Sequence, residues 1–135
     1  MRPRSIVLFE ALSLAAVGLG VLVLAMSWDA LMASVYRSIR GAGIEPAMMI
    51  LCALYVGLLI LLILLTSRRG NAVAKWLFTA IVVAGAVFTV PAVPAMLRGG
   101  IVGGTQLLQL AVQLAGLWFL FAPPSRAWVR AGAPA

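Results

Sequence analysis

The sequence predicts an all-α integral membrane protein in which four transmembrane helices form an antiparallel bundle. Of its 135 residues, 64% are hydrophobic and only 10% are charged, and the mean hydropathy is +1.15. Because soluble domains carry about 25% charged residues, this composition excludes a water-soluble globule. Four apolar stretches each reach the roughly 20 residues that a helix needs to cross the hydrocarbon core. None alternates with a period of two, which argues against a membrane β-barrel.

The predicted spans form one membrane domain and cover residues 5–26, 47–66, 73–97 and 101–122. Helices are favoured because they satisfy their backbone hydrogen bonds internally, as lipid requires. The first stretch follows two arginines, as a secretory signal does. It is nevertheless longer than the apolar region of a signal and contains an acidic residue, so we expect a retained span.

The cationic residues predict the orientation. The formal net charge is +7, but the bases lie beside apolar runs, so the lipid bilayer rather than nucleic acid is the predicted partner. With a cytoplasmic N-terminus, both termini are cytoplasmic and seven of the ten bases lie inside, as the positive-inside rule requires. These seven are Arg2, Arg4, Arg68, Arg69, Lys75, Arg126 and Arg130, whereas Arg37, Arg40 and Arg98 face outward.

The connection between the first two spans, residues 28–40, predicts a short amphipathic helix at the outer interface. Ser27 is expected to cap its start and Gly41 to end it. The helix would either shield the bundle as a lid or serve as a docking face or gate. Its apolar stripe consists of Trp28, Leu31, Met32, Val35 and Ile39.

Proline and glycine predict the shape of the last two spans. Pro91 and Pro94 remove backbone donors, so we expect a kink near the outer end of the third span; such breaks line cavities in some transporters. The pair Gly99-Gly100 makes the next connection very short, so the last two spans should be antiparallel neighbours. Two prolines end the last span, and residues 123–135 are predicted to lie as a tail on the cytoplasmic surface.

The acidic candidate within a predicted span is Glu10, about five residues from the start of the first one. A carboxylate at such a depth can carry protons or bind a cationic substrate. The alternative is a carboxylate near the interface that is paired with Arg4, Lys75 or the hydroxyl of Thr79.

Three glutamines in the fourth span, Gln106, Gln109 and Gln113, are three and four residues apart and therefore share one helix face. Neutral amides in membranes commonly hydrogen-bond across helices. The alternative is a polar stripe that lines a water-filled path or a subunit interface. Small residues mark where helices can approach closely, namely Ala11, Ala15, Ala16 and Gly20 in the first span and Gly103, Gly104 and Gly116 in the fourth.

Two further sets of residues suit the membrane surface. Bases on the cytoplasmic side are candidate contacts for anionic lipids, and tryptophans near the span ends are candidate interfacial anchors. The bases are Arg68, Arg69, Lys75, Arg126 and Arg130, and the tryptophans are Trp28, Trp76 and Trp128.

Catalytic chemistry is not expected. The chain has no histidine, so it offers no Ser-His or Cys-His nucleophile. Its one cysteine, Cys52, excludes an internal disulfide and a cysteine-based metal cage. The three acidic residues are predicted on different sides of the membrane and cannot act together as acid and base. We expect no enzyme activity, no cofactor and no metal.

The segment from Arg68 to Trp76, Arg-Arg-Gly-Asn-x-x-Ala-Lys-Trp, resembles a group of small four-span bacterial inner-membrane proteins. Their Leu-Phe-Glu start is matched by Leu8-Phe9-Glu10, and their Arg-Ala-Trp tail lies within Pro123 to Trp128. The resemblance implies the same fold in a bacterial cytoplasmic membrane, and it implies no activity because the group has none assigned.

The residues therefore predict a non-enzymatic multi-pass membrane protein that acts through helix packing, as an accessory subunit or a homo-oligomer. The alternative is a small oligomeric transporter or channel that uses Glu10 and the face of Gln106, Gln109 and Gln113.

Overall fold

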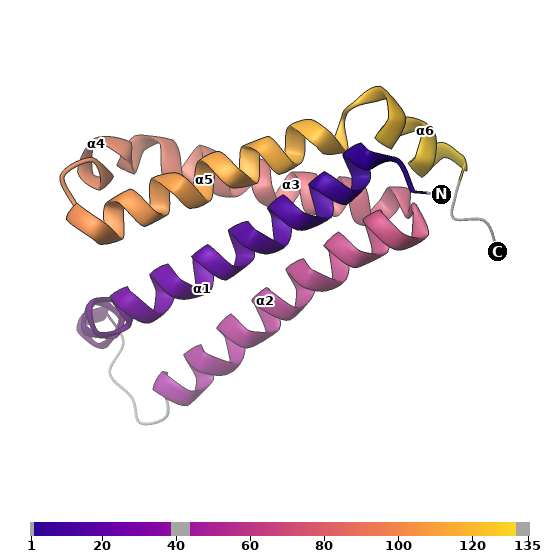
Figure 1. Cartoon of the computed structure of the whole chain (residues 1–135). Helices are drawn as coiled ribbons and strands as arrows, with labels where there is room; N and C mark the ends of the chain where they lie inside the picture. The colour runs from indigo at the N-terminus through magenta and orange to yellow at the C-terminus, as the bar shows by residue number, and fades with distance from the viewer. Residues whose placement is uncertain (1, 39–43, 132–135) are drawn as a thin grey trace.

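A computed structural model describes residues 2–38 and 44–131, which fold into helices joined by short turns (Figure 1). The long helices are α1 (Arg4–Ser38), α2 (Ile44–Arg69), α3 (Ala72–Thr89) and α5 (Gly100–Leu120). Shorter elements are the 3₁₀ turn η1 (Val90–Ala92), α4 (Val93–Met96) and α6 (Pro123–Ala131). Four helical segments, Arg4–Arg37, Ile44–Arg69, Ala72–Met96 and Gly100–Leu120, are long and apolar enough to cross a membrane. The predicted all-helical chain with four candidate spans is confirmed.

Helix α1 is one continuous helix of 35 residues, and it includes most of the segment predicted as a separate amphipathic helix. Ser27, the expected cap, instead lies inside α1 and donates its hydroxyl proton to the carbonyl of Val23 at 2.6 Å. Such a bond from a serine to the preceding turn often bends a helix. The last turns of α1 are nearly end-on in Figure 1 and therefore run at an angle to the rest. Gly41, the expected end, lies outside the described residues.

The predicted break in the third span is confirmed. Helix α3 ends at Thr89, Pro91 lies in η1, and Pro94 lies in α4. Gly100 then adopts a φ of 59°, a conformation that glycine reaches without strain, and it starts α5. This short turn places α4 directly against the start of α5, whereas α3 itself contacts α5 only slightly.

The buried core lies at the end of the molecule that carries both chain termini, which we call the terminal end (Figure 1). Phe9 on α1 and Phe78 on α3 meet edge to face, with ring centroids 5.5 Å apart. The first turns of α1 and α3 and the last turns of α2 and α5 thus close the structure here. The core consists of Ile6, Phe9, Leu59, Leu62, Ile63, Ala74, Phe78, Val82 and Leu120.

Helix α2 packs on its neighbours with one half only. Its buried residues lie between Leu59 and Ser67, whereas large side chains nearer its start, such as Ile50 and Leu54, are exposed. Within the leucine-rich stretch of residues 58–65, Leu61 is exposed whereas its neighbours Leu62 and Ile63 are buried. Away from the terminal end, at what we call the far end, α2 diverges from α1 (Figure 1).

About half of the predicted small residues serve internal packing. The most extensive helix contact is between α1 and α5, where Ala16 and Gly116 are buried. A Cβ atom on Gly116 would lie 2.9 Å from the hydroxyl oxygen of Ser13, so glycine allows this approach without displacing the serine side chain. Ala11, Ala15 and Gly104 are instead exposed.

Candidate functional site: a cleft beside the glutamine row

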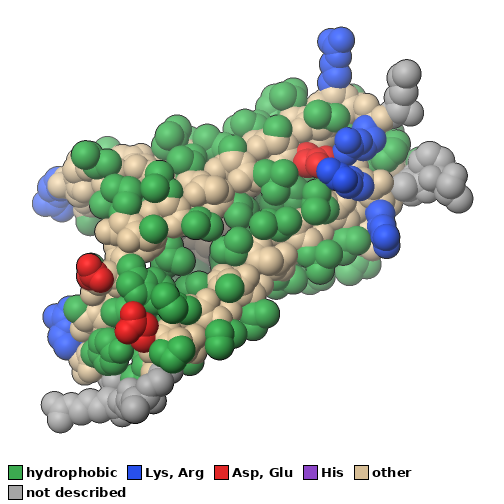
Figure 2. Space-filling view, turned by 60° about the horizontal axis from the view of Figure 1, so that its bottom comes forward, with side chains coloured by type: hydrophobic (Ala, Val, Ile, Leu, Met, Phe, Trp, Pro, Cys, Tyr) green, Lys and Arg blue, Asp and Glu red, His purple; other side chains and the backbone are tan. Residues whose placement is uncertain are grey.

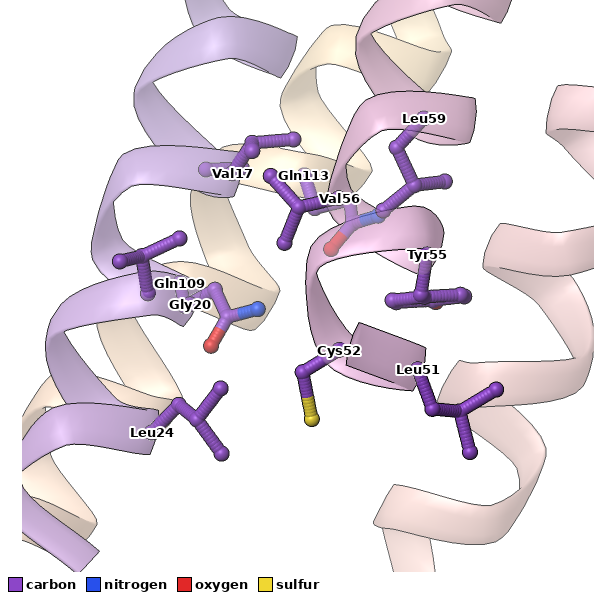
Figure 3. Close-up of a pocket in the computed structure, with 12 residues that line it drawn as sticks. Val17, Gly20, Leu24, Leu51, Cys52, Tyr55, Val56, Leu59, Gln109 and Gln113 are labelled. Carbon is purple, nitrogen blue, oxygen red and sulfur yellow. The ribbon is translucent and has the colours of Figure 1, made fainter. Parts of the chain in front are cut away.

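A cavity of about 510 Å³ lies between α1, α2 and α5, where α2 diverges from its neighbours. This volume is within the usual range of about 300–1,000 Å³ for ligand pockets. Its walls are mainly apolar, and the amides of Gln109 and Gln113 lie between the ribbons of α1 and α2 (Figure 3). Figure 2 shows a hollow in the space-filling surface between helices. We refer to this cavity as the cleft; it is lined by Ala16, Val17, Gly20, Val21, Leu24, Leu51, Cys52, Tyr55, Val56, Leu59, Gln109 and Gln113.

A second cavity of about 260 Å³ lies beside the cleft and reaches α3 and α4. Gln109, Gln113 and Tyr55 line both cavities, and Gln106 lines the second one. The structure therefore brings the three predicted glutamines to one place, along the boundary between two hollows. We call these three residues the glutamine row.

The side-chain amides of the glutamine row make no hydrogen bond to any part of the chain that the structure describes. The expectation that these amides bind neighbouring helices is therefore not met. Helix α1 leaves room for one of them, because a Cβ atom on Gly20 would lie 2.8 Å from Nε2 of Gln109. All three side chains are half-buried, and an amide that lies in lipid without a hydrogen-bond partner costs about 1–3 kcal/mol.

Two lining residues of the cleft, Cys52 and Tyr55, were not among the predicted site residues. Figure 3 shows them on α2, across the cleft from Gly20 and Leu24 of α1. Helix α2 is apolar on all sides, so its sequence carries no periodicity that would identify the side facing α1. The absence of that signal explains why the prediction missed them.

Glu10 forms ion pairs at the terminal end, in agreement with the interpretation as a paired carboxylate near the interface. Its partners are not the predicted ones. Its carboxylate accepts hydrogen bonds from Arg2 at 2.6 Å and from Arg68 at 3.3 Å, and the side chain is 12% exposed. Thr79, an expected partner, instead donates to the carbonyl of Lys75. Glu10 does not line either of the two cavities beside the glutamine row.

Replacing Glu10 by glutamine should lower the free energy of unfolding by no more than about 1 kcal/mol. Both arginine partners are well exposed, at 38% and 64%, so water screens the two ion pairs. Titration of the reconstituted protein with denaturing detergent measures this change, and Glu45→Gln at the far end is the control. A loss of about 3 kcal/mol or more would show that the carboxylate belongs to a buried ion pair instead.

The predicted surface residues have different surroundings. Arg69 is exposed, whereas Lys75 is buried beneath Arg126 and Arg130 of α6. Pro91 and Pro94 lie at the far end and do not line the two cavities beside the glutamine row.

The three predicted tryptophan anchors also differ. Trp76 is 63% exposed on α3. The indole N–H of Trp28 donates a hydrogen bond to Glu45 at 3.3 Å, which connects the last third of α1 to the first turn of α2. Trp128 instead packs against the core, and its buried N–H has no partner among the described residues.

Among residues 2–38 and 44–131, no group of three or more His, Cys, Asp or Glu side chains is placed to hold a metal ion. Comparison of the chain with protein-family models, with curated proteins and with solved structures gives no match.

Proposed function

We propose that this chain is a non-enzymatic multi-pass membrane protein that acts through helix packing, as an accessory subunit or as a homo-oligomer. The observation that carries the proposal is the unpaired glutamine row beside a cleft where α2 diverges from α1. Three amides without partners in a membrane span favour association with a helix that supplies polar groups. A helix from a second copy or from another membrane protein would also fill the space along the first half of α2.

The proposal includes a location in the bacterial cytoplasmic membrane with the terminal end inside. This orientation is supported by the bases, because Arg2, Arg68 and Lys75 lie at that end, as do both arginines of α6. Figure 2 shows basic side chains gathered there around an acidic one. The bent last turns of α1 would then lie at the outer interface, where Trp28 suits headgroup depth.

The test replaces the glutamine row by leucines of similar size in one triple variant, Gln106→Leu, Gln109→Leu and Gln113→Leu. Native mass spectrometry after gentle extraction from the protein's own membrane should show an assembly of fixed stoichiometry for the natural chain. The triple variant should be monomeric, because leucine cannot replace the polar contacts. The mass of the assembly distinguishes a homo-oligomer from an accessory subunit.

The matched control replaces Leu108 and Leu114, which are exposed on the same helix, by alanine. These changes should leave the assembly intact. A monomeric natural chain would contradict the proposal, and so would a triple variant that assembles as well as the natural chain.

A second candidate function is a small oligomeric transporter or channel. It is favoured by the position of the glutamine row between two cavities, and it is opposed by the position of Glu10 outside both. This candidate requires that Glu10→Gln abolish a proton- or cation-coupled flux in liposomes while the assembly persists. An unchanged flux would eliminate the role of the carboxylate.

A further inference from the structure

A third cavity, of about 340 Å³, lies at the terminal end between α3, the end of α5 and α6. Three of its seven lining residues are cationic, and two of the others are aromatic. We call this cavity the basic pocket; it is lined by Ala72, Lys75, Trp76, Phe121, Arg126, Val129 and Arg130.

Lys75 is the most buried of the three cations, with only 6% of its surface exposed. Its Nζ atom lies 4.3 Å from the ring centroid of Phe121 and 5.7 Å from that of Trp76. Contact with aromatic faces partly stabilises an ammonium group. It does not replace an anion, and a buried cation without one is strongly disfavoured.

Helix α6 holds two further cations over the same cavity. Ser125 is fully buried, and its hydroxyl lies 2.7 Å from the carbonyl of Phe119 and 2.8 Å from the hydroxyl of Ser5. This contact fixes the start of α6 against the neighbouring helices. Arg126 donates from Nε to the carbonyl of Phe121 at 2.7 Å. Arg130 is one helical turn further along and so shares its face.

No carboxylate in the described residues pairs with these cations. Glu10, the acidic side chain at the terminal end, is occupied by Arg2 and Arg68. The basic pocket therefore combines the ammonium group of a largely buried lysine with two guanidinium groups, and no carboxylate of the described residues serves as their counter-ion. Guanidinium groups bind phosphate oxygens through paired hydrogen bonds, and an ammonium group adds a point charge.

We infer that the basic pocket binds the phosphate of an anionic phospholipid headgroup. The lipid source follows from the surface beside the pocket, where Val73, Trp76 and Leu77 of α3 are all more than half exposed. These apolar side chains offer a surface to the acyl chains, and tryptophan suits the depth of the headgroups. The inference is independent of the glutamine row and of the proposed assembly.

The test measures lipid retention by native mass spectrometry on the full chain in detergent, with phosphatidylglycerol added as the probe. We expect one phosphatidylglycerol per chain, with phosphatidylcholine retained far less. Lys75→Met and Arg130→Gln should each weaken retention at least about tenfold, because each removes a charged group from a shared site. Arg130 is exposed, so its replacement addresses the pocket without disturbing the core.

The matched control is Arg69→Gln, which removes one charge at the same end of the molecule but outside the pocket. Its effect should be about twofold or less, because Arg69 does not line the pocket and salt screens a surface charge that lies away from the bound phosphate. Equal losses in all three variants would overturn the inference, since they would indicate a diffuse surface charge. Complete displacement of the lipid by millimolar inorganic phosphate would overturn the lipid source and indicate a site for free phosphate.

Discussion

Replacing Gly103 by alanine is expected to destabilise the protein by about 3 kcal/mol or more, at the upper end of the costs of overpacking. A Cβ atom at this position would overlap the backbone carbonyl of Met96, at the point where α4 meets α5. A backbone atom cannot move aside as the end of a flexible side chain can, so α4 and α5 would have to separate. Titration of the protein in bicelles with a denaturing detergent would measure the loss.

The neighbouring residue offers a matched control. Gly104 lies on the same helix, and a Cβ atom there would meet nothing within 4 Å. Gly104→Ala should therefore be neutral or stabilise α5 by about 0.5–1 kcal/mol through the lower backbone entropy of the unfolded chain. Similar losses for Gly103→Ala and Gly104→Ala would show that the close contact between α4 and α5 is not present in the membrane.

The second large effect is expected in the core. Phe78→Ala would remove a side chain that is 1% exposed and that packs edge to face on Phe9. In a water-soluble core such a change costs about 3–5 kcal/mol. Here the separated helices remain in lipid, so the transfer from water contributes nothing and only the packing contacts are lost. We expect a loss of about 2 kcal/mol.

Phe88 on the same helix is the control, because its side chain is 83% exposed. Phe88→Ala should change stability by less than about 0.5 kcal/mol, as surface substitutions usually do. The same detergent titration compares the two variants directly. Equal effects of the two substitutions would mean that the terminal end is not the packed core of the protein.

The expected assembly connects these stability measurements to function. If the glutamine row contacts a second helix, loss of the assembly should lower stability mainly at the far end, where α2 has few contacts of its own. The core at the terminal end should remain intact, because its aromatic and aliphatic contacts are all within the chain. Hydrogen exchange with and without assembly would therefore show protection gained near Cys52 and little change near Phe78.

Local properties of the sequence were enough to predict the four candidate spans and the break in the third, but not the continuation of α1 through Ser27. Apolar runs of sufficient length define the four candidate spans, because only a helix of about 20 residues satisfies its own backbone across lipid. Pro91 and Pro94 predicted the end of α3, since proline cannot donate a backbone hydrogen bond. The pair Gly99-Gly100 likewise predicted the tight turn into α5. Each of these features depends on residues within one or two helical turns.

The tertiary structure alone decided which polar groups meet. Glu10 pairs with Arg68, 58 positions away, and this contact depends on the relative register of α1 and α2. Helix α2 is apolar on every side, so only its packing separates buried Leu62 from exposed Leu61. The spacing of the glutamines placed them on one face, but the divergence of α2 left that face beside a cleft, without partners in the described chain. Composition and periodicity report the environment of a residue along its own helix, whereas the position of the neighbouring helices determines what that residue contacts.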